Sequence, residues 1–245
     1  MSASPSTDFF FDAYDRQDIA YGLEPSAALA AYLTQVGCET SGGNRRAIDL
    51  GAGAGRDSLA LAAAGYAVES VDLSERGLAR IAERATERNV GERVTTRLAD
   101  VRKIEFPKDA YNAVIATTVL DHIPASDAAI VWQRMCDSLS ESGFLYVQVH
   151  TTEDPGSGVS PGDRSKQPVS ETAGAVINYF SPNQLAAMAI DPKSKLRILR
   201  YEERLEWDYT HGAEHQHGKA VLLAVRAGFH PKWYGQPAAF PREEK

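Results

Sequence analysis

The sequence is poor in cysteine and lacks both a long apolar run and a basic cluster. Two cysteines, Cys38 and Cys136, are too few for a disulfide framework or a cysteine-rich zinc site. No stretch is apolar enough to span a bilayer, and residues 1–5 lack the basic and apolar parts of a signal peptide. A formal net charge of −7 without clustered lysine and arginine argues against a nucleic-acid surface. We therefore expect a cytoplasmic protein, monomer or homodimer, that binds a small-molecule substrate, no nucleic acid and no membrane.

The chain is long enough for one α/β domain with a good core. It has 245 residues, of which 43% are hydrophobic. We expect a single domain over residues 1–245, with residues 1–46 as an N-terminal lid and helix. Residues 151–180 begin as a stretch rich in glycine, proline, serine and charge, and a loop of this length is usually functional. We expect it to be a long active-site loop.

A glycine-rich segment organises the chain. The short apolar run of residues 47–50 is followed by Gly51, Gly53 and Gly55, and then by a leucine- and alanine-rich stretch at 58–64. Glycines allow backbone angles and close approaches that a Cβ would block. The pattern predicts a strand, a tight turn and a helix, which is the ligand-binding corner of an open parallel sheet.

The spacing of these glycines does not match the common phosphate-binding motifs. The dinucleotide fingerprint G-x-G-x-x-G/A fails, because Arg56 or Ser58 stands where the third glycine should be. A Walker loop fails as well, since Gly51 is followed at the required distance by Arg56-Asp57. Asp49 would repel a pyrophosphate but suits a cationic ligand group, such as the ammonium or sulfonium of S-adenosylmethionine.

A second acid follows at the end of the next predicted strand, residues 66–72. Asp72 lies about 20 residues past the glycine turn, where an acidic side chain can accept both ribose hydroxyls of a nucleoside. The alternative is that Asp72 only caps the following helix, 75–88, although Ser74 is placed to be its N-cap.

The remaining pattern alternates between strands and helices. The predicted strands after residue 72 are 94–98, 112–117, 144–149, 196–201 and 219–226. Predicted helices include 27–35, a helix N-capped by Ser126 and running to Leu139, and one that begins after Ser181-Pro182.

The motif Asp-x-Gly-x-Gly-x-Gly from Asp49 to Gly55, together with residues 117–124, resembles class I S-adenosylmethionine-dependent methyltransferases. Within that class the chain looks most like the tellurite-resistance (TehB-like) methyltransferases over roughly residues 11–229. This resemblance rests on residues 14–26, 49–61, 117–120, 179–180 and 201–226. It implies a Rossmann-like three-layer α/β sandwich, whose seven-stranded sheet is mostly parallel with an antiparallel last strand.

The resemblance also implies roles for particular residues. The cofactor S-adenosylmethionine would be bound by Tyr14, Tyr21, Asp49, Gly51, Ala52, Gly53, Gly55, Arg56, Asp72, Leu73, Ser74, Asp100, Val101, Thr117 and Thr118. Asp100 would accept from the adenine amino group while its neighbour covers the ring. The two tyrosines would be lid contacts, although they also suit a core.

The candidate catalytic residues are His122, His211 and His215. His122 also fits a structural role. His211 matches an active-site histidine of the TehB-like family, but Gly212 replaces the arginine that follows it there. His215 and His217 would share one face of a strand, yet no third strong ligand is evident, so no metal is expected.

These observations predict methyl transfer to a small molecule, either a chalcogen oxyanion or a thiol. The absent arginine weakens the case for tellurite. The alternatives are a nicotinamide-dependent oxidoreductase, which the glycine spacing disfavours, and an S-adenosylmethionine-binding protein without catalytic activity.

Overall fold

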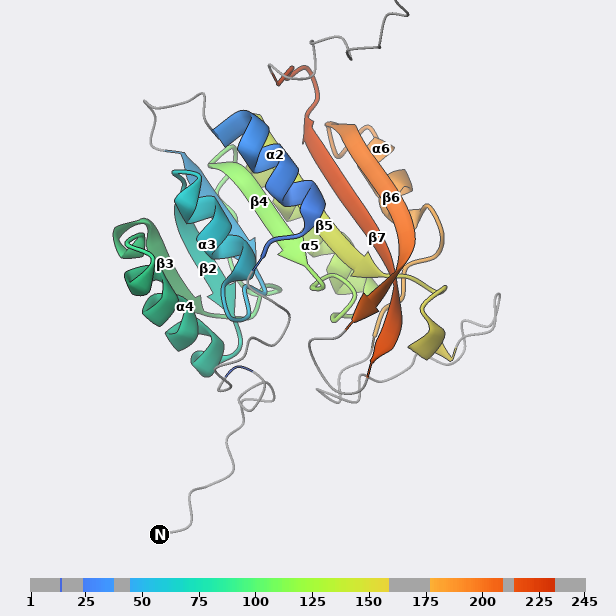
Figure 1. Cartoon of the computed structure of the whole chain (residues 1–245). Coiled ribbons are helices and arrows are strands. Elements are labelled where there is room, and N and C mark those ends of the chain that lie inside the picture. The colour runs from blue at the N-terminus through green and yellow to red at the C-terminus, as the bar shows by residue number, and fades with distance from the viewer. Residues whose placement is uncertain (1–13, 15–23, 38–44, 159–176, 209–213, 232–245) are drawn as a thin grey trace, which may run out of the picture.

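The computed structural model describes residues 14, 24–37, 45–158, 177–208 and 214–231. Within them seven strands form one sheet, in the order β3-β2-β1-β4-β5-β7-β6 (Figure 1). The strands are β1 (Arg46–Leu50), β2 (Ala67–Asp72), β3 (Val94–Leu98), β4 (Tyr111–Thr117), β5 (Leu139–His150), β6 (Leu196–Asp208) and β7 (His215–Arg226). β7 pairs antiparallel with both β5 and β6, whereas the pairs among β1 to β5 are parallel. The predicted fold class is confirmed.

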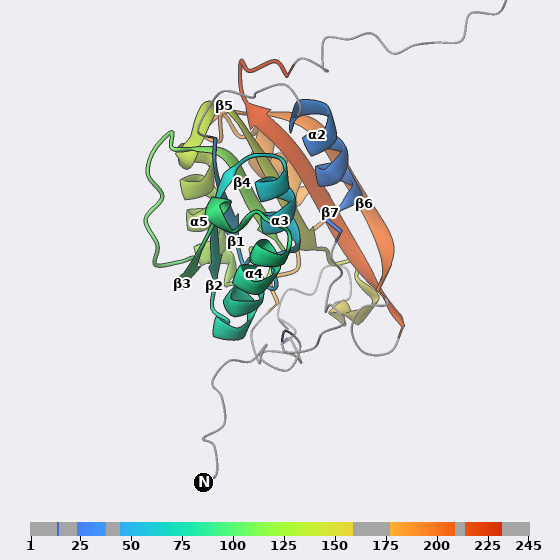
Figure 2. The same ribbon diagram turned by 60° about the vertical axis from the view of Figure 1, so that its left-hand side comes forward.

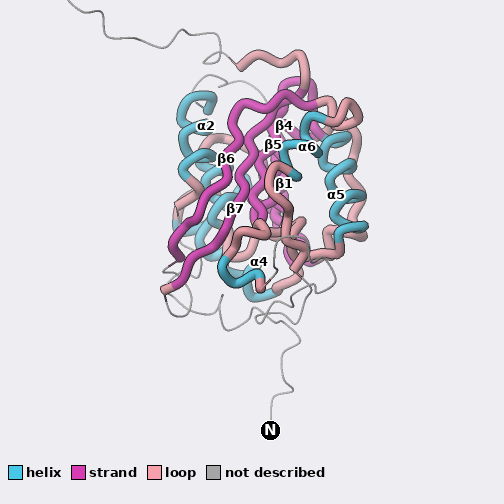
Figure 3. Tube along the Cα trace, turned by 90° about the vertical axis from the view of Figure 1, so that its right-hand side faces the viewer, coloured by secondary structure: helices cyan, strands magenta, loops and turns pink. Residues whose placement is uncertain are grey.

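Helices cover both faces of the sheet. They are α2 (Ala27–Gly37), α3 (Arg56–Ala63), α4 (Glu75–Glu87), α5 (Ala125–Ser138) and α6 (Gln184–Ile190), with short 3-10 turns η1 (Gly91–Arg93) and η2 (Pro155–Ser157). The core on one face joins side chains of α2 and α3, and the core on the other joins those of α5 and α6. Figure 3 shows this division, with α2 on one side of the strands and α5 and α6 on the other.

Burial explains why the central strands form. Residues 113–116 of β4 are all fully buried, as expected for an apolar run in the middle of a parallel sheet. α4 instead buries Leu78, Ile81 and Ala85 on one side, and the Ser74 side chain caps it by accepting from the Gly77 N–H at 3.0 Å. The Ser74 N-cap was predicted correctly.

Two boundaries predicted from the sequence are wrong. The helix α5 begins at Ala125 with Pro124 as its N-cap residue, and Ser126 lies inside the first turn. Proline explains this start, because its fixed φ suits the beginning of a helix. Leu139, predicted as the last residue of that helix, is the first residue of β5.

The last two strands are longer than the sequence predicts. β6 continues past Tyr201 to Asp208, and β7 begins at His215 rather than Lys219 (Figure 2). The extra residues are mostly polar and half-buried, so they lack the apolar signal of a core strand. Charge pairs support them instead, including Lys219 Nζ to Glu206 Oε1 at 3.1 Å.

No helix among the described residues combines the length and apolar character needed to cross a membrane.

Candidate functional site

The glycine turn, residues 51–55, links β1 to α3 at the carboxyl edge of the sheet. Gly51, Gly53 and Gly55 all have positive φ, at 63°, 53° and 92°. A Cβ on Gly51 would overlap the Val119 side chain, and a Cβ on Gly53 would lie 2.9 Å from the Tyr14 hydroxyl. Both reasons for glycine that the sequence suggests, backbone angle and close approach, therefore apply here.

Asp72 ends β2 beside this turn. One carboxylate oxygen accepts the Gly53 N–H at 2.8 Å, and the other accepts the Ser74 N–H at 2.8 Å. The carboxylate is thus held in place by backbone amides, while its oxygens retain lone pairs for further donors. Leu73, the next residue, is 64% exposed at the same edge, so an apolar side chain lies beside the acid.

Asp49 is buried at 2% exposure within β1. Its carboxylate accepts from the Ser58 hydroxyl at 2.6 Å, and that hydroxyl lies 2.7 Å from the Ser70 hydroxyl. Burial, followed by the nearby Asp57 carboxylate, raises the pKa of Asp49 to about 8. The core under the glycine turn therefore holds a carboxyl group that a neighbouring cation would ionise.

Asp57 connects the glycine turn to the end of β4. The Thr117 hydroxyl donates to Asp57 Oδ2 at 2.7 Å. Arg56 Nε lies 3.3 Å from the other carboxylate oxygen, Oδ1. Thr118 follows with a positive φ of 53°, which is strained for a β-branched residue. The predicted residues Arg56, Thr117 and Thr118 are therefore brought close to the turn.

Asp100 lies further along the edge, after β3. Its carboxylate accepts from the Arg102 guanidinium at 2.7 Å and from the Arg102 backbone N–H at 2.9 Å. These bonds to Arg102 hold the pKa of Asp100 below its usual range. Val101 is buried at 8% exposure. The adenine contact suggested for this pair stays a prediction.

Tyr14 is the described part of the predicted lid. Its hydroxyl lies over Gly53, and its backbone carbonyl accepts from Arg80 Nε of α4 at 3.1 Å. Tyr21 and His211 lie outside the described residues. Ala52, also predicted to bind the cofactor, is buried in the turn and donates its N–H to the Val71 carbonyl at 3.0 Å.

A second polar group lies at the same edge beyond β4. We call it the histidine cluster, and it comprises His122, His150, His215, His217, Asp121, Asp154 and Asp208. His150 Nδ1 lies 2.6 Å from Asp121 Oδ2, and His122 Nε2 lies 3.9 Å from the same oxygen. Despite its burial, Asp121 has a pKa below the usual range, because the two histidines favour its charged form.

The other half of the cluster comes from β6, β7 and Asp154, the N-cap residue of η2. His217 Nδ1 lies 2.9 Å from Asp154 Oδ2, and its Nε2 lies 2.9 Å from His215 Nε2. The ring centroids of His150 and His217 are 4.7 Å apart, so the two halves are in contact. Of the histidines that the sequence proposed as catalytic, His122 and His215 are both members.

Sequence reasoning missed four members of this cluster as site residues. They are Asp121, His150, Asp154 and Asp208. Their position was the available signal, because Asp121 follows the carboxyl end of β4 and His150 is the last residue of the neighbouring parallel strand β5. The ends of the long loop meet there too, since Thr151 bridges to Phe180 and the Asn178 N–H donates to the Asp121 carbonyl at 2.7 Å.

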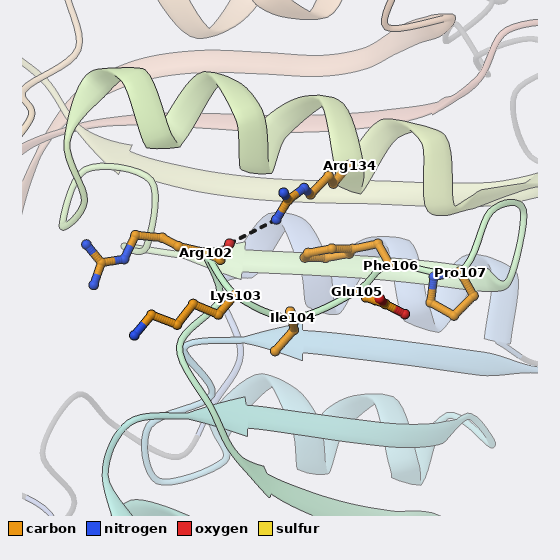
Figure 4. A pocket seen from close by; sticks show the side chains of 7 residues that line it. All are labelled: Arg102, Lys103, Ile104, Glu105, Phe106, Pro107 and Arg134. Carbon is orange, nitrogen blue, oxygen red and sulfur yellow. Dashed lines mark hydrogen bonds between the residues drawn. The ribbon is translucent and has the colours of Figure 1, made fainter.

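An open groove lies elsewhere on the described part of the chain. It has a volume of about 800 Å³ and lies between the β3–β4 connection and α5 (Figure 4). Its lining residues are Arg102, Lys103, Ile104, Glu105, Phe106, Pro107 and Arg134. None belongs to the glycine turn or the histidine cluster, so this groove does not define the candidate site.

Comparison with known proteins matches the part of the chain that holds the glycine turn. Residues 47–143 match the family described as methyltransferase domain. Over this stretch the chain is therefore similar to methyltransferases, and the match supports the enzyme class and the cofactor, S-adenosylmethionine, that the sequence predicts. No curated protein sequence matches the chain.

Solved structures with the same fold include several methyltransferases. TehB from Haemophilus influenzae is 19% identical with a TM-score of 0.61, and the alignment covers 90% of this chain and 66% of TehB. This chain thus spans just under two thirds of that protein. The 1,6-didemethyltoxoflavin-N1-methyltransferase of Burkholderia thailandensis is 18% identical with a TM-score of 0.61, over 90% of this chain and 86% of that one. Magnesium protoporphyrin IX methyltransferase from Synechocystis is 17% identical with a TM-score of 0.60, over 93% and 100%.

The residues at the turn fit this cofactor. Asp72 presents a fixed carboxylate suited to ribose hydroxyls, and Leu73 presents an apolar surface suited to a base. Asp49 is a buried carboxyl group that a cationic ligand group would ionise. A tight turn with positive φ at three glycines has no side chain at these positions that would keep a bound ligand away from the backbone.

Proposed function

We propose that this protein transfers the methyl group of S-adenosylmethionine to a small-molecule acceptor whose nucleophile is a chalcogen, with a thiol as the first choice. One observation carries the proposal. Two buried acids, Asp49 and Asp72, flank a glycine turn whose spacing fits no phosphate-binding motif. This charge suits a nucleoside with a cationic amino-acid end better than it suits a dinucleotide.

The donor brings a methyl group that is already activated on a sulfonium. The residues of this chain therefore have to position two molecules and exclude water, which accounts for most of the catalysis in such a displacement. We assign Asp72 to the ribose, Asp49 and Asp57 to the electrostatic attraction of the cationic end, and Tyr14 to covering the turn. Thr117 and Thr118 would lie between donor and acceptor, because they end β4 next to the glycine turn.

The choice of acceptor rests on the histidine cluster. β5 and β7 lie beyond β4 in the sheet, so the cluster is on the side where the acceptor would approach. Thiols and other chalcogen nucleophiles need little help from a general base once they are ionised, and imidazoles paired with carboxylates favour ionisation. The family resemblance to TehB-like enzymes supports the chalcogen class, while Gly212 in place of arginine disfavours the tellurite oxyanion.

A turnover screen tests this proposal. The full chain would be incubated with S-adenosylmethionine and a panel of thiols, selenite, tellurite, phenols and amines, with S-adenosylhomocysteine release as the readout. We expect release to depend on a thiol or another chalcogen compound, and to fall to background in Asp72→Ala. Tight cofactor binding without release across the whole panel would contradict the proposal and favour a non-catalytic binding protein. Preferential binding of a nicotinamide dinucleotide would favour the oxidoreductase instead.

A further inference from the structure

The histidine cluster contains a set of atoms spaced like metal ligands. His215 and Asp208 are directly opposite each other at the ends of β7 and β6, and His217 lies on the same face of β7 as His215. One ligand atom from each of these three residues lies within 4.8 Å of the others. The third ligand that the sequence did not reveal is thus supplied by the facing strand.

The individual distances agree with this interpretation. His217 Nε2 lies 2.9 Å from His215 Nε2 and 3.9 Å from Asp208 Oδ2. Ligands about 2.1 Å from a tetrahedral metal ion are separated by about 3.4 Å, which lies between those two distances. The same nitrogen of His217 thus faces both other groups, as a shared ion would require.

The Asp154 carboxylate orients the ring of His217 through the nitrogen that faces away from His215. Asp154 Oδ2 lies 2.9 Å from His217 Nδ1, and Asp154 is itself held by the N–H groups of Gly156 at 2.7 Å and Gly218 at 3.1 Å. Metal-bound histidines usually donate their second ring nitrogen to a carboxylate in this way, which directs Nε2 at the metal.

His150 repeats this arrangement next to the site. Its Nδ1 lies 2.6 Å from Asp121 Oδ2, and its ring lies 4.7 Å from the ring of His217. Asp121 is completely buried, and its second oxygen, Oδ1, has no hydrogen-bond partner within the described residues. A buried carboxylate that is half satisfied is costly for a structural role alone, and a positive charge nearby would offset that cost.

We propose that His215, His217 and Asp208 bind a divalent transition metal ion such as Zn²⁺, with His150 beside it. Two imidazoles and one carboxylate leave at least one coordination position open, which is typical of catalytic rather than structural sites. The two histidine ligands on β7 are two strands from β4, or about 10 Å at the usual strand spacing, which is suitable for a bound acceptor.

The metal would act on the acceptor of the proposed function, and this part of the inference rests on that function. A thiol that binds the ion through sulfur releases its proton to solvent and stays as the thiolate. The lone pair of that sulfur then forms the new bond to the methyl carbon. The bond from the methyl carbon to the donor sulfur breaks, and its electron pair remains on the donor as a thioether.

Metal binding is tested on the untagged full chain after treatment with a chelator. Titration with Zn²⁺ in a calorimeter should show one site per chain. His215→Ala and His217→Ala should each weaken binding by about 100-fold, because each removes one of the three ligands proposed among the described residues. His230→Ala is the matched control, since His230 contacts Arg197 at the start of β6, away from the cluster.

Each result bears on the inference. Loss of Zn²⁺ binding in His215→Ala and His217→Ala but not in His230→Ala supports the site, provided that all variants still bind S-adenosylhomocysteine. No saturable binding, or equal weakening in all three variants, overturns it. If His217→Ala does not fold, His215→Ala decides the question, because His215 is partly exposed at the beginning of β7.

Spectroscopy separates this inference from the proposed function. In the Co²⁺-loaded protein, addition of a thiol should produce a sulfur-to-cobalt charge-transfer band that the His217→Ala variant lacks. Thiol methylation by the metal-free protein at an undiminished rate would overturn the metal's role while leaving the methyltransferase function intact. Metal binding with a thiol band but no turnover on any acceptor would instead contradict the proposed function.

Discussion

The glycine turn and the histidine cluster lie on the same edge of one sheet but are assembled differently. The turn comes almost entirely from residues 49–58, with Asp72 added by the neighbouring strand. The cluster needs side chains from the segment after β4, from β5, β6 and β7, and from the N-cap residue of η2. A site made from one continuous segment is visible in the sequence, whereas a site made from distant segments depends on strand order and register.

The separation between the glycine turn and the histidine cluster is tested most strongly by the variants Asp72→Ala and His217→Ala. We expect Asp72→Ala to weaken S-adenosylhomocysteine binding by about 100-fold, because it removes the acceptor of ribose hydroxyls and leaves two backbone N–H groups unpaired. His217→Ala should change this affinity less than about twofold, since it belongs to the other half of the edge. Calorimetry on both variants provides the measurement, and a similar loss in the two would mean that the halves form a single cofactor site.

Asp49 should make cofactor binding depend on pH. Burial and Asp57 raise its pKa to about 8 in the folded protein, and a bound cation would lower that pKa. Affinity should therefore rise with pH toward 8, by about tenfold for each unit by which the ligand lowers the pKa. Calorimetry between pH 6 and about 8.5 would show this, whereas Asp49→Asn should bind with little pH dependence.

The same carboxyl group should affect the stability of the ligand-free protein in the opposite sense. Its pKa is raised on folding, so between about 4 and 8 the folded state binds more protons than the unfolded state. The free energy of unfolding should accordingly fall as pH rises through that range. Urea unfolding of wild type and Asp49→Asn tests this, and an identical pH slope in both proteins would exclude Asp49 as the cause.

A smaller effect is expected for Gly53→Ala. Its φ of 53° is left-handed, and its new Cβ would lie 2.9 Å from the Tyr14 hydroxyl. We expect a loss of about 1–2 kcal/mol in the free energy of unfolding, since an L-residue is strained there. Adding Tyr14→Phe should recover part of the loss by removing the overlap. A double-mutant cycle based on urea unfolding measures this coupling, and strict additivity would show that Tyr14 does not cover the turn.

Asp100→Asn should have the smallest effect. Arg102, whose side chain is 41% exposed, already pairs with the Asp100 carboxylate, so one hydrogen bond to adenine is the most that is lost. We expect S-adenosylhomocysteine binding to weaken by about fivefold, corresponding to roughly 1 kcal/mol. Unchanged S-adenosylhomocysteine affinity in a calorimeter would show that Asp100 does not contact the cofactor. A loss as large as that of Asp72→Ala would show that Asp100 contributes as much to binding as Asp72 does.

Local patterns made much of the fold predictable. The run at residues 113–116 is apolar because β4 is buried on both faces, and Ser74 is a helix cap because its side chain accepts a backbone N–H. Such features depend on residues that are neighbours in the sequence. The same holds for the glycine turn, where every special backbone angle belongs to a glycine.

The ends of β6 and β7 were not predictable from such patterns. Their residues are mostly polar and half-buried, and pairs such as Lys219 with Glu206 exist only after the strands are aligned. Asp208 therefore could not be recognised as the partner of His215 before the register was known. The site role of His150 could not be predicted for a related reason. It is the last residue of an apolar strand, and its partner Asp121 is 29 residues away in the sequence.

The segment that contains Val119 links the glycine turn to the histidine cluster. The Val119 side chain fills the space that the missing Cβ of Gly51 leaves, while two residues further on Asp121 holds His150. A short, tightly packed segment thus touches the donor corner with one residue and supports the imidazoles with another. We therefore expect a displacement of that segment to alter both the glycine turn and the position of His150, without any movement of a whole domain.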